Sequence, residues 1–513
     1  MDSALARSEG LVRSLAGRFS GGDAAAAEVI ETHISWVLLT ADRALKVKKP
    51  VRLPFADFST LELRRALCED EVRLNRRLAP DLYLGVVPIG GTHDAPMLGA
   101  EPAIEVAVEM RRFESSERLD RVLARDEVSA ADLRALAERV ATFHAALEPD
   151  VDPGGRGGSA DVVEAALENF EELHEMLGAD AGRVESLEAW TRDECERLGP
   201  VFAARKREGR VVEGHGDLHT ENIARIAGDL VPFDALEFSA ALRWTDTMAE
   251  VGFLAMDLAV RGRRDLAYEF VDRYLEVTGD HDGLRVLRFY VVYRAVVRAK
   301  VAAIGRVQRG ESPLPDADEH FGFARRAIGR PEPVLVVTHG LSGSGKTTVT
   351  NELVGALPAV RVRSDVERKR LFGLAAEERS GSEVGGGLYT RAASGATYDR
   401  LEECAAAALD GGVSVVVDAT FLRRAERDRF RVLAASKGAR AVVLACVAPD
   451  DVLRDRVARR EAEGRDASEA TLEVLEHQLR SYEPVEGEEA EQAVVVDTTR
   501  PLDAAALARA LTS

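Results

Sequence analysis

Cysteine is scarce in this sequence of 513 residues, and long apolar runs are absent from it. The few cysteines lie far apart and form no Cys-x-x-Cys pair: Cys68, Cys195, Cys404 and Cys446. This spacing argues against a zinc site or a disulfide framework and is typical of a reducing compartment. No run of about 18 or more apolar residues occurs, and no apolar core of the signal-peptide type follows Met1. We therefore expect a cytoplasmic protein that does not cross a membrane.

Lysine is also rare, because only eight of the 68 basic residues are lysines. The sequence uses arginine almost wherever a positive charge is needed. The positions that keep lysine therefore draw attention, because a compact ammonium differs physically from a planar guanidinium. Three of the eight lysines lie within residues 46–49, and another, Lys346, lies in a glycine-rich segment.

The net charge of the chain is −20. This charge repels nucleic acid unless a local basic patch overrides it, so we do not expect a nucleic-acid partner. The same charge could attract a cationic substrate, or it could simply keep the protein soluble. The length predicts roughly three compact units. The sequence contains no internal repeat, and it does not define an oligomeric state.

The first 112 residues read as a small sheet with one helix. Apolar residues at helical spacing predict a helix over residues 59–78, with Ser59 or Thr60 as its cap. Runs rich in β-branched and apolar residues predict strands at 33–40, 44–51, 82–89 and 103–110.

The pattern from about residue 117 to residue 330 is mostly helical, with long helices expected over 244–310. Three stretches interrupt it, and we expect them to be loops or linkers: 152–161, 310–320 and 329–333. A βα alternation begins at residue 334 and runs to the end of the sequence. We therefore predict three domains: 1–112, 113–330 and 331–513.

The first motif with a chemical meaning is His215-Gly216-Asp217-Leu218-His219-Thr220-Glu221-Asn222. Its aspartate and asparagine are five residues apart, as in the catalytic loop of protein kinases. In that chemistry the aspartate accepts the proton of the attacking hydroxyl, and the asparagine oxygen binds Mg²⁺. We therefore expect Asp217 to be a catalytic base and Asn222 a metal ligand.

A short hairpin should follow this motif, because two apolar stretches flank Ala227-Gly228-Asp229. Asn222 and Asp234 are each six residues from Gly228, so a hairpin centred on this glycine would place them opposite each other. Carboxylate and amide oxygens suit Mg²⁺, and Asp234 is therefore expected as the second metal ligand.

A kinase of this type also needs a lysine on a strand and a glutamate on a helix to hold the ATP phosphates. Lys46 and Lys48 alternate with Leu45 and Val47, so both lysines share one face of the predicted strand. Both remain candidates for this lysine. Glu71 is the expected glutamate, with Glu62 and Glu69 as alternatives on the same helix.

With these residues in place, residues 28–300 resemble the aminoglycoside phosphotransferase family. The resemblance implies a bilobal kinase-like fold that uses ATP and Mg²⁺, with backbone of residues 109–111 meeting adenine. Residues 31–40 and 57–89 are similar to an uncharacterised bacterial branch of the family, so an antibiotic substrate is not implied. The glycine-rich phosphate-covering loop is missing from the sequence. His215 and His219 are expected to hold the shape of the loop.

The second motif, residues 340–347, matches Gly-x-x-x-x-Gly-Lys-Thr without a gap, between an apolar run and an amphipathic helix. Backbone N–H groups of such a loop surround phosphate, its lysine reaches the terminal phosphates, and its threonine holds Mg²⁺. The nucleotide-binding residues expected here are Gly340, Ser342, Gly343, Ser344, Gly345, Lys346, Thr347 and Thr348, with Thr347 also a metal ligand.

Two acidic and two basic residues complete the expected second site. Asp418 ends the apolar run 413–417, as a Walker B aspartate does, and it could instead contact the substrate. Asp365 follows a short strand and would face the acceptor hydroxyl. Arg456 and Arg460 share a helix face and could clamp the transferring phosphoryl group, or they could be ordinary exposed charges.

Residues 333–500 resemble the zeta-toxin, gluconate-kinase and polynucleotide-kinase group of P-loop kinases. The fold class that we expect is therefore an α+β kinase-like fold followed by an α/β P-loop domain with a mostly parallel sheet. The expected function is an ATP-dependent kinase with two Mg–ATP sites that act on unidentified small-molecule hydroxyls. Two alternatives remain: an inactive kinase-like sensor that regulates the P-loop enzyme, and a toxin-like or stress-regulatory nucleotide switch.

Overall fold

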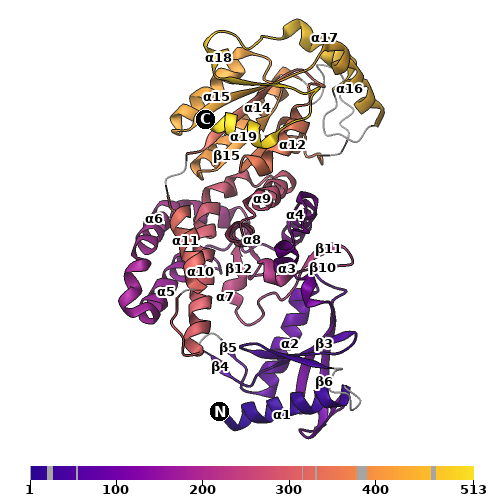
Figure 1. The fold of residues 1–513 in the computed structure, drawn as a ribbon, viewed down its shortest axis with the longest axis vertical. Coiled ribbons are helices and arrows are strands. Elements are labelled where there is room, and N and C mark those ends of the chain that lie inside the picture. The colour runs from indigo at the N-terminus through magenta and orange to yellow at the C-terminus, as the bar shows by residue number, and fades with distance from the viewer. Residues whose placement is uncertain are drawn as a thin grey trace. The chain divides into compact units, whose positions relative to one another are not determined.

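We analysed a computed structural model of the chain (Figure 1). It describes residues 2–19, 27–53, 56–314, 316–329, 332–376, 378, 390–463 and 470–513. These residues fall into two compact units, each built from two stretches of chain. Unit 1 contains residues 1–162 and 203–254, and unit 2 contains residues 163–202 and 255–513.

Unit 1 is built on a six-stranded antiparallel sheet with the strand order β1-β2-β3-β8-β6-β7. The strands are β1 (Glu28–Glu31), β2 (Ser35–Leu39), β3 (Arg43–Lys48), β6 (Tyr83–Thr92), β7 (Ala95–Leu98) and β8 (Glu105–Arg111). A short ribbon, β4 (Arg52–Leu53) and β5 (Ala56–Asp57), lies beside it in sequence. The four strands expected in this region are present, and β1 also falls within residues 28–51, where the sequence indicates strands. Strand β7 was not expected.

One helix covers each face of this sheet. Helix α1 (Asp2–Phe19) packs Leu11 and Leu15 against Leu45 and Val47 of β3. Helix α2 (Leu61–Asn75) packs on the opposite face, and the Oγ1 of Thr60 caps it by accepting from Leu63 N–H at 3.3 Å. Because side chains alternate along a strand, the odd positions of β3 pack toward α1 and its even positions face α2. The apolar stripe of α1 is short and interrupted by glycines, so the sequence pattern did not reveal this helix.

The rest of unit 1 is a set of short helices and ribbons that carry the first motif. The helices are η1 (Ser115–Glu117), α3 (Leu119–Ala124), α4 (Ala130–Ala145), η3 (Thr220–Asn222) and α7 (Ala240–Arg243). The ribbons pair β10 (Ile223–Ile226) with β11 (Asp229–Pro232), and β9 (Val211–Glu213) with β12 (Trp244–Asp246). Three helices contribute to both units: α5 (Ser159–Leu177), α6 (Glu185–Arg207) and α8 (Thr247–Val260).

The hairpin after the first motif has a different register from the expected one. Ile226 pairs with Asp229, so the turn contains only Ala227 and Gly228, both with positive φ. This is the geometry of a two-residue hairpin turn, which matches the right-handed twist of the strands. As a result, Asn222 bonds to Phe233 through the backbone and is not directly opposite Asp234.

Unit 2 begins with helices that were expected from the sequence. They include η2 (Gly178–Arg183), α9 (Arg264–Thr278), η4 (His281–Gly283), α10 (Leu284–Gln308) and α11 (Asp316–Ala327). The prediction of a loop over residues 310–320 was wrong in its second half, because α11 begins at Asp316. The expected linker at 329–333 falls partly on residues 330–331, which lie outside the described residues.

The other part of unit 2 is a five-stranded parallel sheet in the order β14-β15-β13-β16-β17. The strands are β13 (Val334–His339), β14 (Ala359–Arg363), β15 (Ser414–Asp418), β16 (Arg440–Val447) and β17 (Ala493–Asp497). The helices are α12 (Lys346–Ala356), α13 (Ser364–Leu371), α14 (Arg391–Asp410), α15 (Arg424–Ser436), α16 (Asp450–Glu463), α17 (Leu472–Ser481), α18 (Glu488–Glu491) and α19 (Ala504–Thr512). The predicted fold class is thus confirmed: an antiparallel sheet with helices precedes a parallel P-loop sheet.

The strand order decides what can meet at the carboxyl edge of this sheet. The central strand is β13, which leads into the glycine-rich loop. Residues after β14 and β15 lie on one side of the loop, and residues after β16 and β17 lie on the other side. Parallel α/β sheets bind ligands at this edge, where connections leave in opposite directions.

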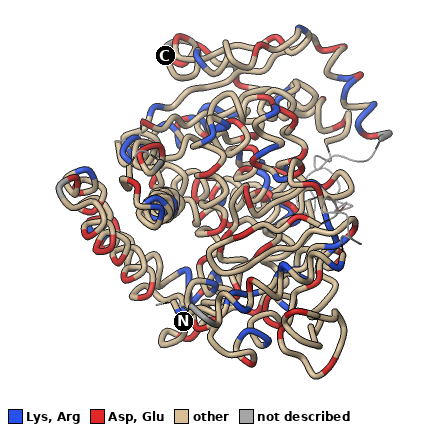
Figure 2. Tube along the Cα trace, turned by 60° about the horizontal axis from the view of Figure 1, so that its bottom comes forward, with Lys and Arg blue, Asp and Glu red and all other residues tan. Residues whose placement is uncertain are grey.

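No helix among the described residues is both long enough and apolar enough to cross a membrane. Figure 2 shows that acidic and basic residues are interspersed along the chain. The predicted domain boundaries at 112 and 330 remain predictions.

Gly411, at the end of α14, makes a close backbone contact that leads to a first prediction. A Cβ at this position would overlap the carbonyl oxygen of Leu284, where α10 begins, and would lie 2.8 Å from its carbonyl carbon. We expect Gly411→Ala to destabilise unit 2 by about 1–3 kcal/mol, because neither backbone can give way easily. The loss would be measured as a lower unfolding midpoint of the full chain in scanning calorimetry.

The matched control is Gly305→Ala, inside α10. Its Cβ would meet only the Nη1 of Arg309, at 3.6 Å, which is an ordinary contact. Because alanine favours a helix interior by about 0.5–1 kcal/mol, this variant should be as stable as wild type or more so. Equal midpoints for the two variants would contradict the close approach of α14 and α10.

Candidate active sites

The first motif forms a compact loop between β9 and β10 of unit 1. Asn222 Nδ2 donates to Asp217 Oδ2 at 2.9 Å and to the Asp217 carbonyl at 3.1 Å. His219 Nε2 lies 3.3 Å from the same Oδ2 atom. The structure therefore brings the expected base and the expected metal ligand together, and the amide oxygen of Asn222 is left facing away from Asp217.

The two histidines of the motif support the loop, as the sequence indicated. His215 Nε2 donates to the carbonyl oxygen of Phe233 at 2.9 Å, while its Nδ1 accepts from Asp217 N–H at 3.3 Å. Burial lowers the pKa of His215, which keeps the ring neutral. The Nδ1 of His219 accepts from Glu221 N–H, and its ring packs on Phe253.

Glu250 on α8 binds the backbone of the loop that carries Asp217, and it was not predicted from the sequence. Its Oε1 accepts from Gly216 N–H at 2.5 Å, and its Oε2 lies 2.8 Å from His144 Nε2. Burial would raise the pKa of Glu250, but the bonds from His144 and the loop lower it to about 2. A buried carboxylate with two hydrogen-bonding partners is a rigid anchor for the backbone beside Asp217. The one signal in the sequence that could have found Glu250 is that it is an acidic residue in a mostly apolar helix.

Asp234 is held in a strained backbone conformation with φ of +60°. Its N–H donates to the hydroxyl of Tyr83 at 3.0 Å, and the N–H of Ala235 donates to Asn75 Oδ1 at 2.8 Å. Strain of this kind persists where the surroundings fix it and is common at functional sites. It directs the Asp234 carboxylate to Lys46, whose Nζ lies 2.5 Å from Asp234 Oδ1.

A network of buried charges joins β3 to α2 in unit 1. Glu71 contacts both candidate lysines, with Oε1 at 2.9 Å from Lys46 and Oε2 at 2.7 Å from Lys48. Lys48 also pairs with Glu237, which the sequence analysis did not single out. The alternative glutamates, Glu62 and Glu69, are exposed on α2.

The two lysines differ in exposure and in partners. Lys48 is fully buried between two carboxylates, whereas Lys46 is 8% exposed and contacts the strained Asp234. Burial would lower the pKa of both lysines, but the carboxylates raise it above the ordinary value. Burial opposes ionisation of Glu71 as well, yet the two lysines lower its pKa to about 2. This arrangement suits Lys46 as the lysine that reaches ligand and Lys48 as a structural ion pair.

Two other expectations for unit 1 have clear positions in the structure. Residues 109–111 end β8, where Glu109 pairs with Arg43 at 3.3 Å. The turn between β1 and β2, residues 32–34, contains no glycine. Thr32 fixes it by accepting from Lys49 Nζ through its carbonyl oxygen.

In unit 2, the glycine-rich loop connects β13 to the N-terminus of α12. Gly343 and Gly345 have φ of +82° and +83°, and a Cβ on Gly343 would lie 2.8 Å from the carbonyl oxygen of Leu453. These positions therefore require glycine, and the loop can turn its N–H groups inward to surround an anion. The expected residues Ser342, Ser344 and Thr348 lie in the same loop and first turn.

Lys346 and Thr347 are the first two residues of α12, directly after this loop. Lys346 Nζ donates to the carbonyl oxygens of Gly340 and Leu341, both at 2.9 Å. Thr347 Oγ1 donates to Asp418 Oδ2 at 2.9 Å, so the structure brings the expected threonine and aspartate together. Burial lowers the pKa of Lys346, and Asp418 offsets only part of this effect.

Asp365 is the first-turn aspartate of α13, and Arg368 lies 3.5 Å from its Oδ1. Asp365, Lys346 and Asp418 all line a cavity of about 1310 Å³ at the carboxyl edge of the sheet. Arg363, which precedes Asp365 in the same cavity, is paired with Glu276 Oε1 of α9 at 3.0 Å.

Helix α9 holds strand β14 by several more contacts. Arg361, which is almost fully buried, donates its N–H to Asp272 Oδ1 at 2.6 Å and pairs with Glu276 Oε2 at 3.1 Å. Arg370 of α13 donates to the Glu276 carbonyl oxygen at 2.6 Å. Strand β14, which leads to Asp365, is thus fixed by residues 272–276, about 90 positions earlier in the sequence.

The predicted arginines of α16 have different partners. Arg456 donates to the carbonyl oxygen of Gly343 at 3.3 Å and to Thr498 Oγ1 at 2.8 Å, so it lies against the glycine-rich loop. Arg460 donates to the carbonyl oxygen of Ala470 at 3.2 Å. Both line the cavity. The sequence around these arginines, residues 451–470, also predicts a lid helix, but residues 464–469 lie outside the described residues. The side chain of Gln478, missed by sequence reasoning, accepts from Ser342 N–H at 2.8 Å.

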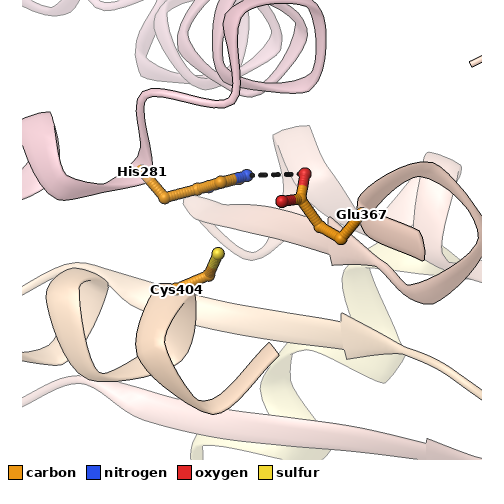
Figure 3. A group of neighbouring side chains, drawn as sticks. All are labelled: His281, Glu367 and Cys404. Carbon is orange, nitrogen blue, oxygen red and sulfur yellow. Dashed lines mark ion pairs between the residues drawn. The ribbon is translucent and has the colours of Figure 1, made fainter. Parts of the chain in front are cut away.

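A separate group of buried side chains, His281, Glu367 and Cys404, lies where η4 meets α13 and α14 (Figure 3). Glu367 is already neutralised, because Arg370 Nε and Arg400 Nε each donate to one of its oxygens at 3.1 Å. Burial raises the pKa of Cys404 to about 12, so its thiol stays protonated. Metal ligands must be deprotonated, and the two guanidiniums would repel a cation. This donor set therefore fits an ion-pair network and not a metal site.

Comparison with known proteins finds one family model and several solved structures that are similar to parts of the chain. Residues 335–485 match the family model described as AAA domain. A gluconokinase from Sinorhizobium meliloti covers 36% of this chain and 90% of its own, with 23% identity and a TM-score of 0.24. A choline kinase from Cryptosporidium parvum covers 59% of this chain and 88% of its own, with 10% identity and a TM-score of 0.39. The family model thus matches the part of the chain that contains the glycine-rich loop and the parallel sheet.

The similarity to one curated relative extends along most of the chain. The uncharacterized protein Rv2004c of Mycobacterium tuberculosis is 33% identical over 449 residues, which cover 86% of this chain and 88% of the relative. Identity at this level over most of both chains shows that the two proteins have a common ancestor. The chain therefore belongs to the same family as the mycobacterial protein Rv2004c.

Proposed function

We propose that the protein is a bifunctional ATP-dependent phosphotransferase that acts on small-molecule hydroxyls at two separate sites. The observation that carries the proposal is that each unit holds a buried lysine with acidic side chains close to it. Unit 1 supplies Lys46 with Glu71 and Asp234, and unit 2 supplies Lys346 with Asp418 near Thr347. A sensor without catalysis would not need the hydrogen-bonded pair of Asp217 and Asn222.

At the first site, Asp217 would accept the proton of an acceptor hydroxyl as its oxygen attacks the γ-phosphorus of ATP. The bond from that phosphorus to the bridging oxygen would break, and ADP would leave with the electron pair. His215, Asn222 and Glu250 hold the loop, so the carboxylate is positioned before the substrate binds. Such positioning is the main source of rate acceleration in phosphoryl transfer.

At the second site, the glycine-rich loop and Lys346 would hold the ATP phosphates, and Asp365 would orient the acceptor hydroxyl. Arg456 lies against the loop and would add positive charge near the transferring phosphoryl group. The same bonds form and break as at the first site.

The donor atoms at both sites fit Mg²⁺, which prefers oxygen ligands. Asn222 uses its amide nitrogen to bond Asp217, which leaves its oxygen for a metal, and Asp234 offers a carboxylate. Thr347 donates its proton to Asp418, which leaves its oxygen lone pairs. When bound, the ion would neutralise charge on the phosphate oxygens.

The two lysines of β3 provide a second prediction, because only one of them is placed to reach ATP. Lys46→Met should lower kcat/KM for ATP at the first site by about 10- to 100-fold, since it removes charge-assisted bonds to phosphate. Lys48→Met should instead destabilise unit 1 by about 3–5 kcal/mol, because it leaves Glu71 and Glu237 buried without their partner. Kinetics and thermal unfolding of both variants would separate the roles, and the reverse result would show that Lys48 binds the nucleotide.

The third prediction concerns the base. Asp217→Asn should lower phosphoryl transfer at the first site by about 10²- to 10⁴-fold with little change in stability, since the amide keeps the shape of the side chain. Products would be identified by mass spectrometry after incubation of the full chain with ATP and a metabolite extract. Asp229→Asn, an exposed change in the adjacent hairpin, is the matched control. Unchanged products with Asp217→Asn, or none in the wild type, would favour a sensing module.

The fourth prediction concerns the P-loop. Lys346→Ala should weaken ATP binding at the second site by about 10- to 100-fold, because the buried ammonium contacts only carbonyl oxygens before phosphate arrives. Calorimetric titration in the Lys46→Met background isolates this site. Lys437→Ala removes a partly exposed lysine of the same unit and should leave the affinity unchanged. If Lys346→Ala also leaves it unchanged, the loop does not bind nucleotide.

A further inference from the structure

The cavity of the P-loop site is strongly cationic, although the chain as a whole is acidic. Four carboxylates line it: Glu352, Asp365, Asp418 and Glu426. Against these stand Lys346 and nine arginines: Arg363, Arg368, Arg391, Arg423, Arg429, Arg456, Arg459, Arg460 and Arg500. Magnesium–ATP would neutralise only part of this excess, so positive charge remains for another ligand.

The strand order separates these arginines into two groups around the glycine-rich loop. Arg456, Arg459 and Arg460 belong to α16, which follows β16, and Arg456 contacts the loop itself. Arg500 follows β17 and belongs to the same group. Five others follow or end β14 and β15, on the side of Asp365: Arg363, Arg368, Arg391, Arg423 and Arg429. The second group therefore lies where the acceptor hydroxyl has to be, away from the lid helix.

Most of the acceptor-side arginines already have acidic partners. Arg363 pairs with Glu276, Arg368 lies 3.5 Å from Asp365, and Arg429 pairs with Asp399 and Glu402. Arg391 and Arg423 differ, because among the described residues neither guanidinium has an ion-pair partner, and both side chains are exposed in the lining of the cavity. The Glu426 carboxylate beside Arg423 accepts from its backbone N–H at 3.4 Å. Two arginines without an ion-pair partner leave net positive charge on this side of the cavity. This charge favours the binding of an anion.

These two arginines lie on helices that are tied together beside the cavity. Residues 391, 394, 395 and 398 of α14 all line it, which is the spacing of one helix face. Tyr398 donates its hydroxyl to Glu426 Oε2 at 3.1 Å and so joins this face to the first turn of α15, next to Arg423. The face presents Arg, Ser, Gly and Tyr, a polar surface that can bond oxyanions.

We propose that the acceptor of the P-loop site is a small alcohol that already carries a phosphate group, that is, a phosphate monoester with a free hydroxyl. This inference rests on the function proposed above. Arg391 and Arg423 bind the oxyanion, and Asp365 meets the free hydroxyl. Arginine is suited to this role, because its planar donors match the oxygens of a phosphate group.

This assignment places the second site after a phosphorylation. A phosphate monoester with a free hydroxyl is the class of product that transfer of a phosphoryl group to a polyol gives. The first site has this chemistry, so it is one reaction class that can supply the acceptor of the second. The second product would carry two phosphates on one carbon skeleton.

The test measures anion binding to the full chain while the nucleotide site is filled. Protein saturated with Mg²⁺ and the non-hydrolysable analogue AMP-PNP is titrated with glycerol 3-phosphate, inorganic phosphate and glycerol. We expect the two anions to bind and glycerol not to bind. Arg391→Gln and Arg423→Gln should each weaken anion binding about 10-fold or more. The control Arg424→Gln changes the neighbouring arginine, which does not line the cavity, and should have no effect.

The results distinguish a failure of the proposed function from a failure of the present inference. If AMP-PNP binds equally to wild type and to Lys346→Ala, the P-loop does not use ATP, and both the proposed function of this site and the present inference are wrong. If AMP-PNP binding depends on Lys346 but the anions do not bind, or bind equally to both arginine variants, only the inference is overturned. Arginine-dependent binding of a single-stranded oligonucleotide, without binding of glycerol 3-phosphate, would also overturn the small-molecule class.

Discussion

A buried lysine ammonium is the feature on which the geometry of both candidate sites depends. Removing a charge from water is unfavourable unless something nearby compensates for it, so each lysine needs partners before the nucleotide arrives. Unit 1 provides carboxylates for this purpose: Lys46 and Lys48 share Glu71, with Asp234 and Glu237 at either end. The position of α2 against β3 and the strained backbone of Asp234 follow from this requirement.

In unit 2 the buried lysine is compensated by carbonyl dipoles instead of by carboxylates in direct contact. Lys346 contacts two carbonyl oxygens of its own loop, and its pKa is lowered, whereas the pKa of Lys46 is raised. Carbonyl oxygens compensate an ammonium only partly, so Lys346 retains a strong attraction for phosphate. In unit 1 a ligand has to compete with Glu71 and Asp234 for the lysine. The two sites therefore hold their lysines in opposite electrostatic states before binding.

The parts that the sequence predicted are those whose chemistry is local in the chain. Asp217 and Asn222 are five residues apart, and the glycine-rich loop is continuous, so spacing alone located both. The fold class followed from the period of apolar residues. Glu250, Glu237 and Gln478 were missed, because each contacts a residue that is distant in sequence and none of the three belongs to a motif. The error in the hairpin had a similar cause: Asp229 is a common turn residue, but here it starts a strand.

The contacts of α9 with β14 have a consequence for how such a protein can evolve. The buried Arg361 and the cavity-lining Arg363 both depend on Glu276, and Arg361 also depends on Asp272. If recombination moved the P-loop half into another gene, with a crossover between α11 and β13, Arg361 and Arg363 would lose their acidic partners. Strand β14, which leads to Asp365, would then be held less firmly. We therefore expect the two halves to stay together in one gene. Substitutions at residues 272–276 should be accompanied by substitutions at residues 361–363 in related proteins.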